Sequence, residues 1–197
     1  MRDNEIVVVS GLPRSGTSMM MKMLEAGGIE PLTDRVREAD EDNLGGYYEF
    51  EQVKKVTRDS SWLEQARGRA VKVISRLLRD LPPAYAYKVI FMQRDLDEVL
   101  ASQQQMLLRR GQAGGEISDA EMKRLFIRHL EEVADWLGRQ PNFAVLYANY
   151  NAILAQPREH SRRIDQFLGG GLEVERMAAT VDQQLYRQRA GRPGAHR

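Results

Sequence analysis

The sequence contains no cysteine and only three histidines. The absence of cysteine excludes disulfides, thiolate metal sites and cysteine nucleophiles, and it is typical of proteins from reducing compartments. The histidines, His129, His160 and His196, lie far apart in the chain and share no metal-ligand spacing. We therefore expect no zinc site and no structural metal.

An excess of charge of one sign is also lacking, because 29 Lys and Arg face 28 Asp and Glu, for a net charge of +1. No overall field draws the chain to nucleic acid or to an anionic membrane, so we expect no nucleic-acid partner. The N-terminal apolar run is shorter than the core of a signal peptide, and a membrane span needs about 20 apolar residues. We expect a cytoplasmic protein without an integral membrane segment, in which a local site binds any anion.

The chain length of 197 residues fits one domain with its own hydrophobic core. We expect a single domain over residues 1–197. Residues 186–197 are rich in Gly and Arg without an apolar anchor, and we expect them to form a flexible tail.

Short apolar runs rich in β-branched residues predict buried strands. There are four of them, at residues 6–10, 70–75, 87–93 and 143–149. Strands that alternate with helices predict an α/β fold of three layers, α/β/α, around a central parallel sheet. Ligands of such folds bind in the crevice at the carboxyl ends of the strands.

Helix signals occupy the segments between these strands. The first predicted helix covers residues 17–26 and ends at Gly27 and Gly28. Two more begin with capping-box spacing, at Asp95 and at Ser118, and extend to about residues 110 and 139. The last carries an apolar stripe that predicts core packing: Leu125, Leu130, Val133 and Leu137.

The segment GLPRSGTS, residues 11–18, follows the first strand and opens the first helix. Its two glycines let successive backbone N–H groups point at one anion, and the helix N-terminus adds its positive end. A nucleotide-binding P-loop has a lysine after the second glycine, where this chain has Thr17, and the cation here is Arg14 inside the loop. The pattern favours one compact phosphate or phosphosulfate over a magnesium triphosphate. The alternative is a turn that binds nothing.

A second pattern lies at the end of the third predicted strand. Arg94 follows this strand, and Ser102 comes eight residues later on the next helix. The long guanidinium side chain can reach toward that helix face, so both residues are candidates to bind a second phosphate. The alternative is that Arg94 pairs with an acidic residue of its own helix and that Ser102 is only a small helix residue.

Together the two patterns resemble the sulfotransferase family, whose members bind 3′-phosphoadenosine 5′-phosphosulfate (PAPS). The family's 5′-phosphosulfate loop reads Pro-Lys/Arg-Ser-Gly-Thr-Thr/Ser, and it is matched by Pro13, Arg14, Ser15, Gly16, Thr17 and Ser18. The family's 3′-phosphate element, an arginine followed eight residues later by a serine, is matched by Arg94 and Ser102. Further segments, from Tyr147 through Pro157 to residues 163–169, resemble the family's later motifs, so the resemblance spans residues 6 to about 169.

The resemblance implies a P-loop NTPase-like sulfotransferase fold and a transfer of a sulfuryl group from PAPS, without a metal, to a hydroxyl or amine. The acceptor would be a small molecule, a lipid or a carbohydrate. The implied PAPS-binding residues are Arg14, Ser15, Gly16, Thr17, Ser18, Arg94 and Ser102. Arg14 would also stabilise the charge on the departing 5′-phosphate. The chain is much shorter than the family's cytosolic enzymes, so the acceptor lid is either minimal or contributed by the second subunit of a homodimer.

At the position of the catalytic base the chain departs from the pattern of the family's cytosolic enzymes. The cytosolic enzymes carry a Lys-x-His motif, in which Lys72 matches the lysine but Ile74 stands in place of the histidine base. Other branches use a glutamate, and Glu49 follows a Gly-Gly turn and two tyrosines. A carboxylate desolvated beside aromatic rings is a stronger base. We therefore expect Arg14, Glu49 and Lys72 to be catalytic; the alternative is that Glu49 is a first-turn helix acid that pairs with Lys54.

Two other functions stay open. A P-loop kinase or nucleotidase is disfavoured by Thr17 and by the lack of a strand that ends directly in a magnesium-binding aspartate. A non-catalytic nucleotide-binding module of the same fold is favoured only by the missing histidine. Near the C-terminus, Arg189 begins a segment similar to the family's Arg-Lys-Gly-x-x-Gly element, but Ala190 replaces the lysine and an accidental match is the better interpretation.

Overall fold

Four parallel strands form the centre of the computed structural model, which describes residues 5–34, 46–109, 111 and 117–181. Their spatial order is β2 (Ala70–Lys72), β1 (Glu5–Gly11), β3 (Ala86–Gln93) and β4 (Phe143–Asn149). In the register of the sheet, Val8 of β1 lies opposite Val71 on one side and Val89 on the other. The predicted parallel sheet is confirmed, and the carboxyl ends of all four strands lie at one edge.

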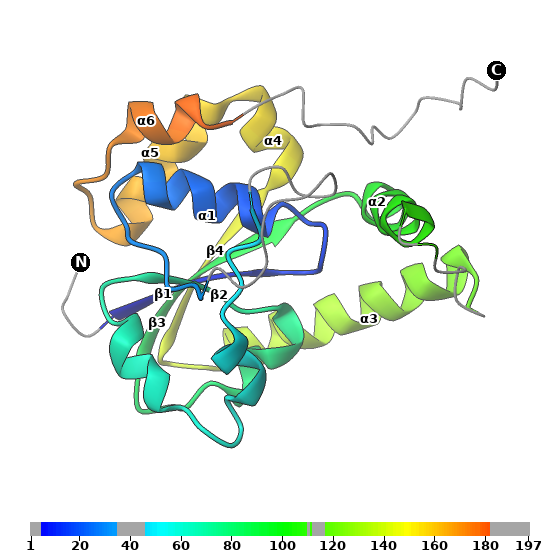
Figure 1. Cartoon of the computed structure of the whole chain (residues 1–197), viewed down its shortest axis with the longest axis horizontal. Helices are drawn as coiled ribbons and strands as arrows, with labels where there is room; N and C mark the ends of the chain where they lie inside the picture. Colours follow the sequence, from blue (N-terminus) through cyan, green and yellow to red (C-terminus); the bar gives the residue numbers. More distant parts are fainter. Residues whose placement is uncertain (1–4, 35–45, 110, 112–116, 182–197) are drawn as a thin grey trace.

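Both faces of the sheet are covered, because the side chains of β1 alternate between two hydrophobic clusters (Figure 1). Val7 and Val9 face α1 (Thr17–Ala26), α4 (Tyr150–Ala155), α5 (Pro157–Leu168) and α6 (Val174–Ala179). Ile6 and Val8 face α3 (Asp119–Gly138) and the short 3-10 helices η1 (Glu51–Lys55), η2 (Ser61–Ala66) and η3 (Ser75–Asp80). The predicted three layers are therefore confirmed.

The predicted helix starts are also confirmed. α1 has the predicted bounds, and α2 (Leu96–Arg109) begins directly after Asp95. The Asp95 carboxylate accepts hydrogen bonds from the backbone N–H groups of Asp97 and Glu98, at 2.9 and 3.3 Å. The Ser118 hydroxyl caps α3 by accepting from the Glu121 N–H. The first N–H groups of a helix have no acceptor within the helix, and these capping side chains accept their hydrogen bonds.

The apolar stripe of α3 is only partly core, which corrects the prediction. Val133 and Leu137 are 2% exposed, whereas Leu125 is 44% exposed. A helix of 20 residues is about 30 Å long, but a strand of seven residues is only about 23 Å long. The N-terminal part of α3 therefore extends past the sheet, as Figure 1 shows, and Leu125 has no sheet to pack on.

The second strand is shorter than the predicted residues 70–75. β2 ends at Lys72, although the Val73 N–H still donates to the Val9 carbonyl at 3.0 Å. The chain then turns at Ile74, which is 41% exposed, and η3 begins at Ser75. The predicted tail at residues 186–197, with Arg189, lies outside the described residues.

Gly16 before α1 and Gly28 after it allow a matched test of how closely the loop before α1 packs. Gly16 and Gly28 both have φ of +99°, a left-handed conformation. A Cβ on Gly16 would lie 2.4 Å from Cδ2 of Tyr150, whereas a Cβ on Gly28 would meet nothing within 4 Å. Gly28→Ala should cost about 1–2 kcal/mol from the left-handed backbone alone. Gly16→Ala should cost clearly more, measured by urea unfolding, and equal losses would contradict the close packing of Tyr150.

Candidate functional site

The loop between β1 and α1 is a tight turn with two left-handed residues. The backbone N–H and the hydroxyl of Ser15 both donate to the Leu12 carbonyl, at 3.2 and 2.7 Å. Arg14 has φ of +69° and Gly16, the N-cap of α1, has φ of +99°. Turns of this kind make successive N–H groups converge on an anion. The N-cap is a glycine, so it has no side chain that could occupy the first N–H groups of the helix.

The side chain of Arg14 extends from this loop to α2. Its Nε donates a hydrogen bond to Oγ of Ser102 at 2.9 Å, across 88 residues of sequence. Ser102 is 7% exposed. The structure thus brings together the two sequence patterns that were each predicted to bind a phosphate.

Arg94 lies beneath the loop, where it forms a buried ion pair with Glu98 of α2. The Arg94 Nε is 3.0 Å from Oε2 of Glu98, and their side chains are 8% and 1% exposed. Nη1 of Arg94 donates to the carbonyl oxygen of Arg14 at 3.1 Å. The guanidinium carbon lies 4.5 Å from the ring centroid of Tyr150, a cation–π distance. Burial raises the pKa of Tyr150, so the ring stays neutral.

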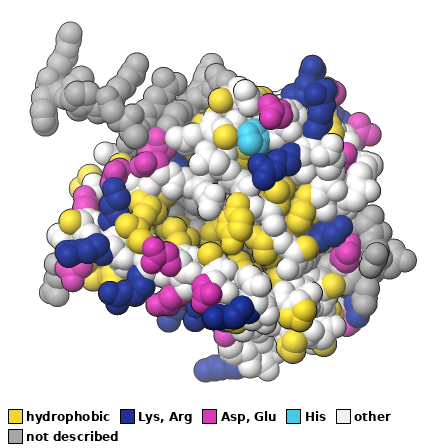
Figure 2. Space-filling view, turned by 180° about the vertical axis from the view of Figure 1, so that it is seen from behind, with side chains coloured by type: hydrophobic (Ala, Val, Ile, Leu, Met, Phe, Trp, Pro, Cys, Tyr) yellow, Lys and Arg dark blue, Asp and Glu magenta, His cyan; other side chains and the backbone are white. Residues whose placement is uncertain are grey.

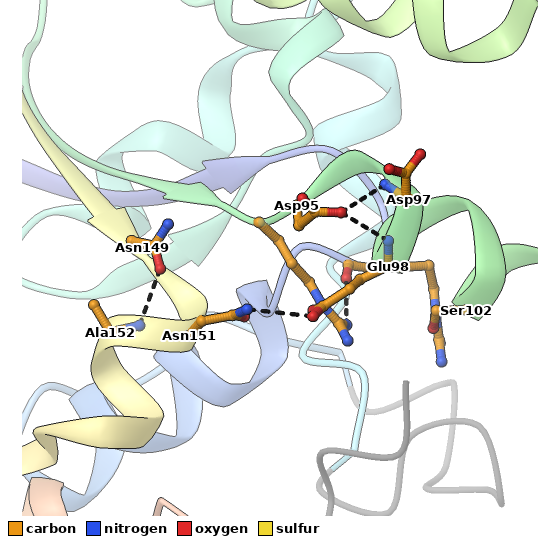
Figure 3. Close-up of polar contacts among 9 residues, drawn as sticks. Asp95, Asp97, Glu98, Ser102, Asn149, Asn151 and Ala152 are labelled. Carbon is orange, nitrogen blue, oxygen red and sulfur yellow. Dashed lines mark hydrogen bonds and ion pairs between the residues drawn. The ribbon is translucent and has the colours of Figure 1, made fainter. Parts of the chain in front are cut away.

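Asn151 of α4 completes the surroundings of Glu98. Its Nδ2 donates to Oε1 of Glu98 at 3.3 Å. Figure 3 shows this amide and Glu98 pointing toward each other from α4 and α2. The carboxylate is thereby held from both sides.

These contacts decide one alternative left open by the sequence. Arg94 does pair with an acidic residue of its own helix, Glu98. The partner of Ser102 in the structure is Arg14, not Arg94. Sequence reasoning missed the role of Glu98, although its position four residues after Arg94 was a usable signal. No signal in the sequence pointed to Tyr150 or Asn151.

Lys72 connects the end of β2 to two other parts of the site. Its Nζ donates to the backbone carbonyl of Tyr47, and it lies 3.4 Å from Oγ of Ser18 in the first turn of α1. Lys72 and the segment that contains Glu49 therefore meet beside α1.

Glu49 itself lies two residues before the start of η1 and is only partly exposed. Its backbone carbonyl accepts hydrogen bonds from the hydroxyl of Thr33 and the N–H of Asp34, at 2.8 and 3.3 Å. The partner of Lys54 is Glu51, at 2.5 Å. Glu51, and not Glu49, is the acid of the first turn that pairs with Lys54.

Comparisons with known proteins agree with this geometry. The sulfotransferase domain family matches residues 4–190. The chain belongs to the sulfotransferase family. No curated protein matches it. The chain is similar in fold to a mouse sulfotransferase complexed with PAP, with a TM-score of 0.54, 20% identity, and coverage of 92% of this chain and 64% of that one.

Two further solved structures share the fold. A retinol dehydratase in complex with androsterone and inactive cofactor PAP has a TM-score of 0.52 and 19% identity, over 92% of this chain and 64% of that one. A sulfotransferase domain from the curacin biosynthetic pathway has a TM-score of 0.54 and 14% identity, over 89% of this chain and 77% of that one. The chain thus spans less than two thirds of the length of the mouse sulfotransferase and of the retinol dehydratase.

The described residues include no group of three or more His, Cys, Asp or Glu side chains that could bind a metal ion. Among the described helices, none is both long and apolar enough to cross a membrane.

A cavity of about 190 Å³ lies beside the loop, at the carboxyl ends of β3 and β4. Ser15 and Arg94 border it, and the apolar part of its wall comes from Leu12, Phe91, Val99, Leu130, Ala134 and Tyr147. The Tyr147 ring packs 5.6 Å from that of Phe91 and is 36% exposed. Figure 2 shows further hydrophobic side chains gathered in a hollowed band on one face of the molecule, with charged side chains around it.

A serine–histidine pair joins η3 to α3. Oγ of Ser75, which is 2% exposed, is 2.8 Å from Nε2 of His129 on α3. Burial lowers the pKa of His129 below its usual 6.5; Glu132 opposes this effect, and Arg79 and Arg76 add to it. No local pattern in the sequence indicates this pair, because its two residues are 54 positions apart and meet only where α3 packs on η3.

The lowered pKa of His129 predicts how stability responds to acid. At pH values between the pKa of His129 in the folded protein and its pKa of about 6.5 in the unfolded chain, the unfolded chain binds more protons than the folded one. The stability of the fold therefore falls as the pH drops through this range. An NMR titration of the imidazole should give a midpoint below 6.5. His129→Gln should remove this part of the pH dependence of unfolding, and a midpoint at or above 6.5 would contradict the burial.

Proposed function

We propose that this chain is a sulfotransferase that transfers a sulfuryl group from PAPS to a hydroxyl or amine acceptor. The observation that carries the proposal is the hydrogen bond between Arg14 and Ser102, because it joins the loop suited to a 5′-phosphosulfate to the helix suited to a 3′-phosphate. Membership of the sulfotransferase family supports the same activity. When bound, PAPS supplies an activated sulfuryl group whose leaving group is the 5′-phosphate.

The residues present fit such a nucleotide. The loop offers backbone N–H groups at the start of α1, the hydroxyls of Thr17 and Ser18, and the guanidinium of Arg14. With Ser15 and Gly16, which shape the turn, they would hold the 5′ end. Arg94 and Ser102 would hold the 3′-phosphate. Arg14 and Lys72 would stabilise the negative charge of the departing phosphate, because both cations lie at the carboxyl edge of the sheet.

A magnesium triphosphate fits these residues less well. The loop has Thr17 where a P-loop lysine would stand. The acid nearest the end of β3, Asp95, uses its carboxylate to cap α2. It is therefore poorly placed to bind a magnesium ion.

The proposed base is Glu49, which would take the proton from the acceptor as sulfur is transferred. The contact of Lys72 with the Tyr47 carbonyl ties the segment of Glu49 to the sheet end that carries the loop. PAP and androsterone in one of the similar structures support a small-molecule acceptor, with a lipid or carbohydrate as the alternatives. The proposal includes a homodimer, whose second subunit would add acceptor contacts, and a cytoplasmic location, which suits the use of PAPS.

Calorimetric titration with adenosine 3′,5′-bisphosphate, and separately with ATP and magnesium, tests the donor. We expect binding of the bisphosphate, about tenfold weaker in Ser102→Ala because one hydrogen bond to a charged group is lost. Ser161→Ala is the matched control, since Ser161 is a buried serine of α5 whose hydroxyl has no hydrogen-bond partner among the described residues. Binding of ATP without the bisphosphate would overturn the proposal in favour of a kinase or nucleotidase.

Glu49→Gln tests the base with any acceptor that the unaltered protein sulfates. The rate should fall about 10²- to 10⁴-fold, the usual contribution of a general base, while the affinity for the bisphosphate stays the same. Glu51→Gln is the control, because Glu51 is a neighbouring exposed acid that pairs with Lys54. An unchanged rate in Glu49→Gln would exclude it as the base. Binding of the bisphosphate without sulfation of any acceptor would instead indicate a non-catalytic module.

A further inference from the structure

Glu98 is a buried acid with no role in the proposed transfer. It is 2% exposed and lies in the first turn of α2. Oε2 accepts from Nε of Arg94 at 3.0 Å, and Oε1 accepts from Nδ2 of Asn151 at 3.3 Å. Removing a carboxylate from water costs several kcal/mol, and replacing a buried ion pair by apolar residues is often neutral for stability. The pair therefore needs an explanation other than stability.

The contacts of Arg94 suggest what this pair does. A guanidinium is a rigid planar fork, so a bond that fixes Nε also fixes the direction of Nη1. Glu98 holds Nε, the ring of Tyr150 lies 4.5 Å from Cζ, and Nη1 then donates to the carbonyl of Arg14. Glu98 thus determines where the donor to the Arg14 carbonyl lies.

Arg14 needs such a donor because its backbone is strained. Its φ of +69° is a left-handed conformation, which is energetically costly for a non-glycine residue. The surrounding structure must offset this cost. Arg94 contacts the Arg14 carbonyl, and Ser102 contacts its side chain.

We propose that Glu98 is a positioning residue of the donor site, which holds the loop at residues 12–16 in its anion-binding shape through Arg94. The proposal rests on the proposed function for the identity of the ligand. Glu98 does not touch the nucleotide. It acts on the 5′ end of the site, because the contact it fixes is with the loop.

Two ligands separate this role from an effect limited to the 3′ end. Adenosine 5′-monophosphate has only the 5′-phosphate that the loop would bind, whereas adenosine 3′,5′-bisphosphate has both phosphates. In Glu98→Gln the carboxylate charge is lost at nearly the same size, and the affinity for the monophosphate should fall about tenfold. The affinity for the bisphosphate should fall by at least this factor, because Arg94 would also hold its 3′-phosphate. At saturating PAPS, kcat should fall as well, because Arg14 is displaced. Asp97→Asn is the control, since Asp97 is an exposed acid of the same helix turn that pairs with Lys123.

Each result has one meaning. No binding of the bisphosphate by the unaltered protein contradicts the proposed function itself. If the unaltered protein binds the bisphosphate, the affinity of Glu98→Gln for the monophosphate decides the positioning role. An unchanged affinity for the monophosphate overturns that role, even if the affinity for the bisphosphate falls. A calorimetric stoichiometry of one shows that the variant is folded.

A second variant covers the case in which Glu98→Gln does not fold. Arg94→Met combined with Glu98→Leu replaces the pair by apolar side chains of similar size, which buried positions tolerate. It removes the donor to the Arg14 carbonyl, so monophosphate binding should again weaken about tenfold. Monophosphate binding equal to that of the unaltered protein would overturn the proposal.

Discussion

The contact between the Arg94 guanidinium and the backbone carbonyl of Arg14 is the interaction on which the site depends. A loop that binds an anion with its N–H groups must adopt a conformation that most residues avoid, and Arg14 adopts it without being a glycine. The strain is tolerated because one arginine holds the backbone of another. The sheet makes this contact possible, since β1 and β3 are parallel neighbours whose ends lie side by side.

The cations around the loop differ in their partners. Arg14 and Lys72 lie where they can contact hydroxyls of α2 and α1. Arg94 is neutralised by Glu98, with the ring of Tyr150 against its face. This pairing limits the cost of burying the Arg94 side chain, because an isolated charge out of water is far more costly than a paired one. Arg14 and Lys72 stay suited to an anionic ligand.

Much of the fold could be predicted, because buried parallel strands and capped helices leave local patterns. The bounds of α1 and the caps at Asp95 and Ser118 follow from residues that lie next to each other in the chain. The predictions that extended an apolar pattern to a given length were less accurate. β2 stops at Lys72, and Leu125 extends an apolar stripe beyond the sheet that would bury it. Neither limit is visible locally, since each depends on the length of another element.

For the candidate site, the sequence alone identified the loop at residues 11–18 and the pair of Arg94 and Ser102, because glycine spacing and strand ends are local features. Only the tertiary structure decided the long-range partners: Ser102 contacts the Arg14 side chain, Arg94 contacts the Arg14 carbonyl, and the aromatic ring at the site is that of Tyr150. Tyr147, where the segment similar to the family's later motifs begins, lines the neighbouring cavity. A sequence shows which side chains are close to the end of a strand. The direction in which each points follows from the packing of α2 and α4 against that end, over separations of 50 to 90 residues that no local pattern records.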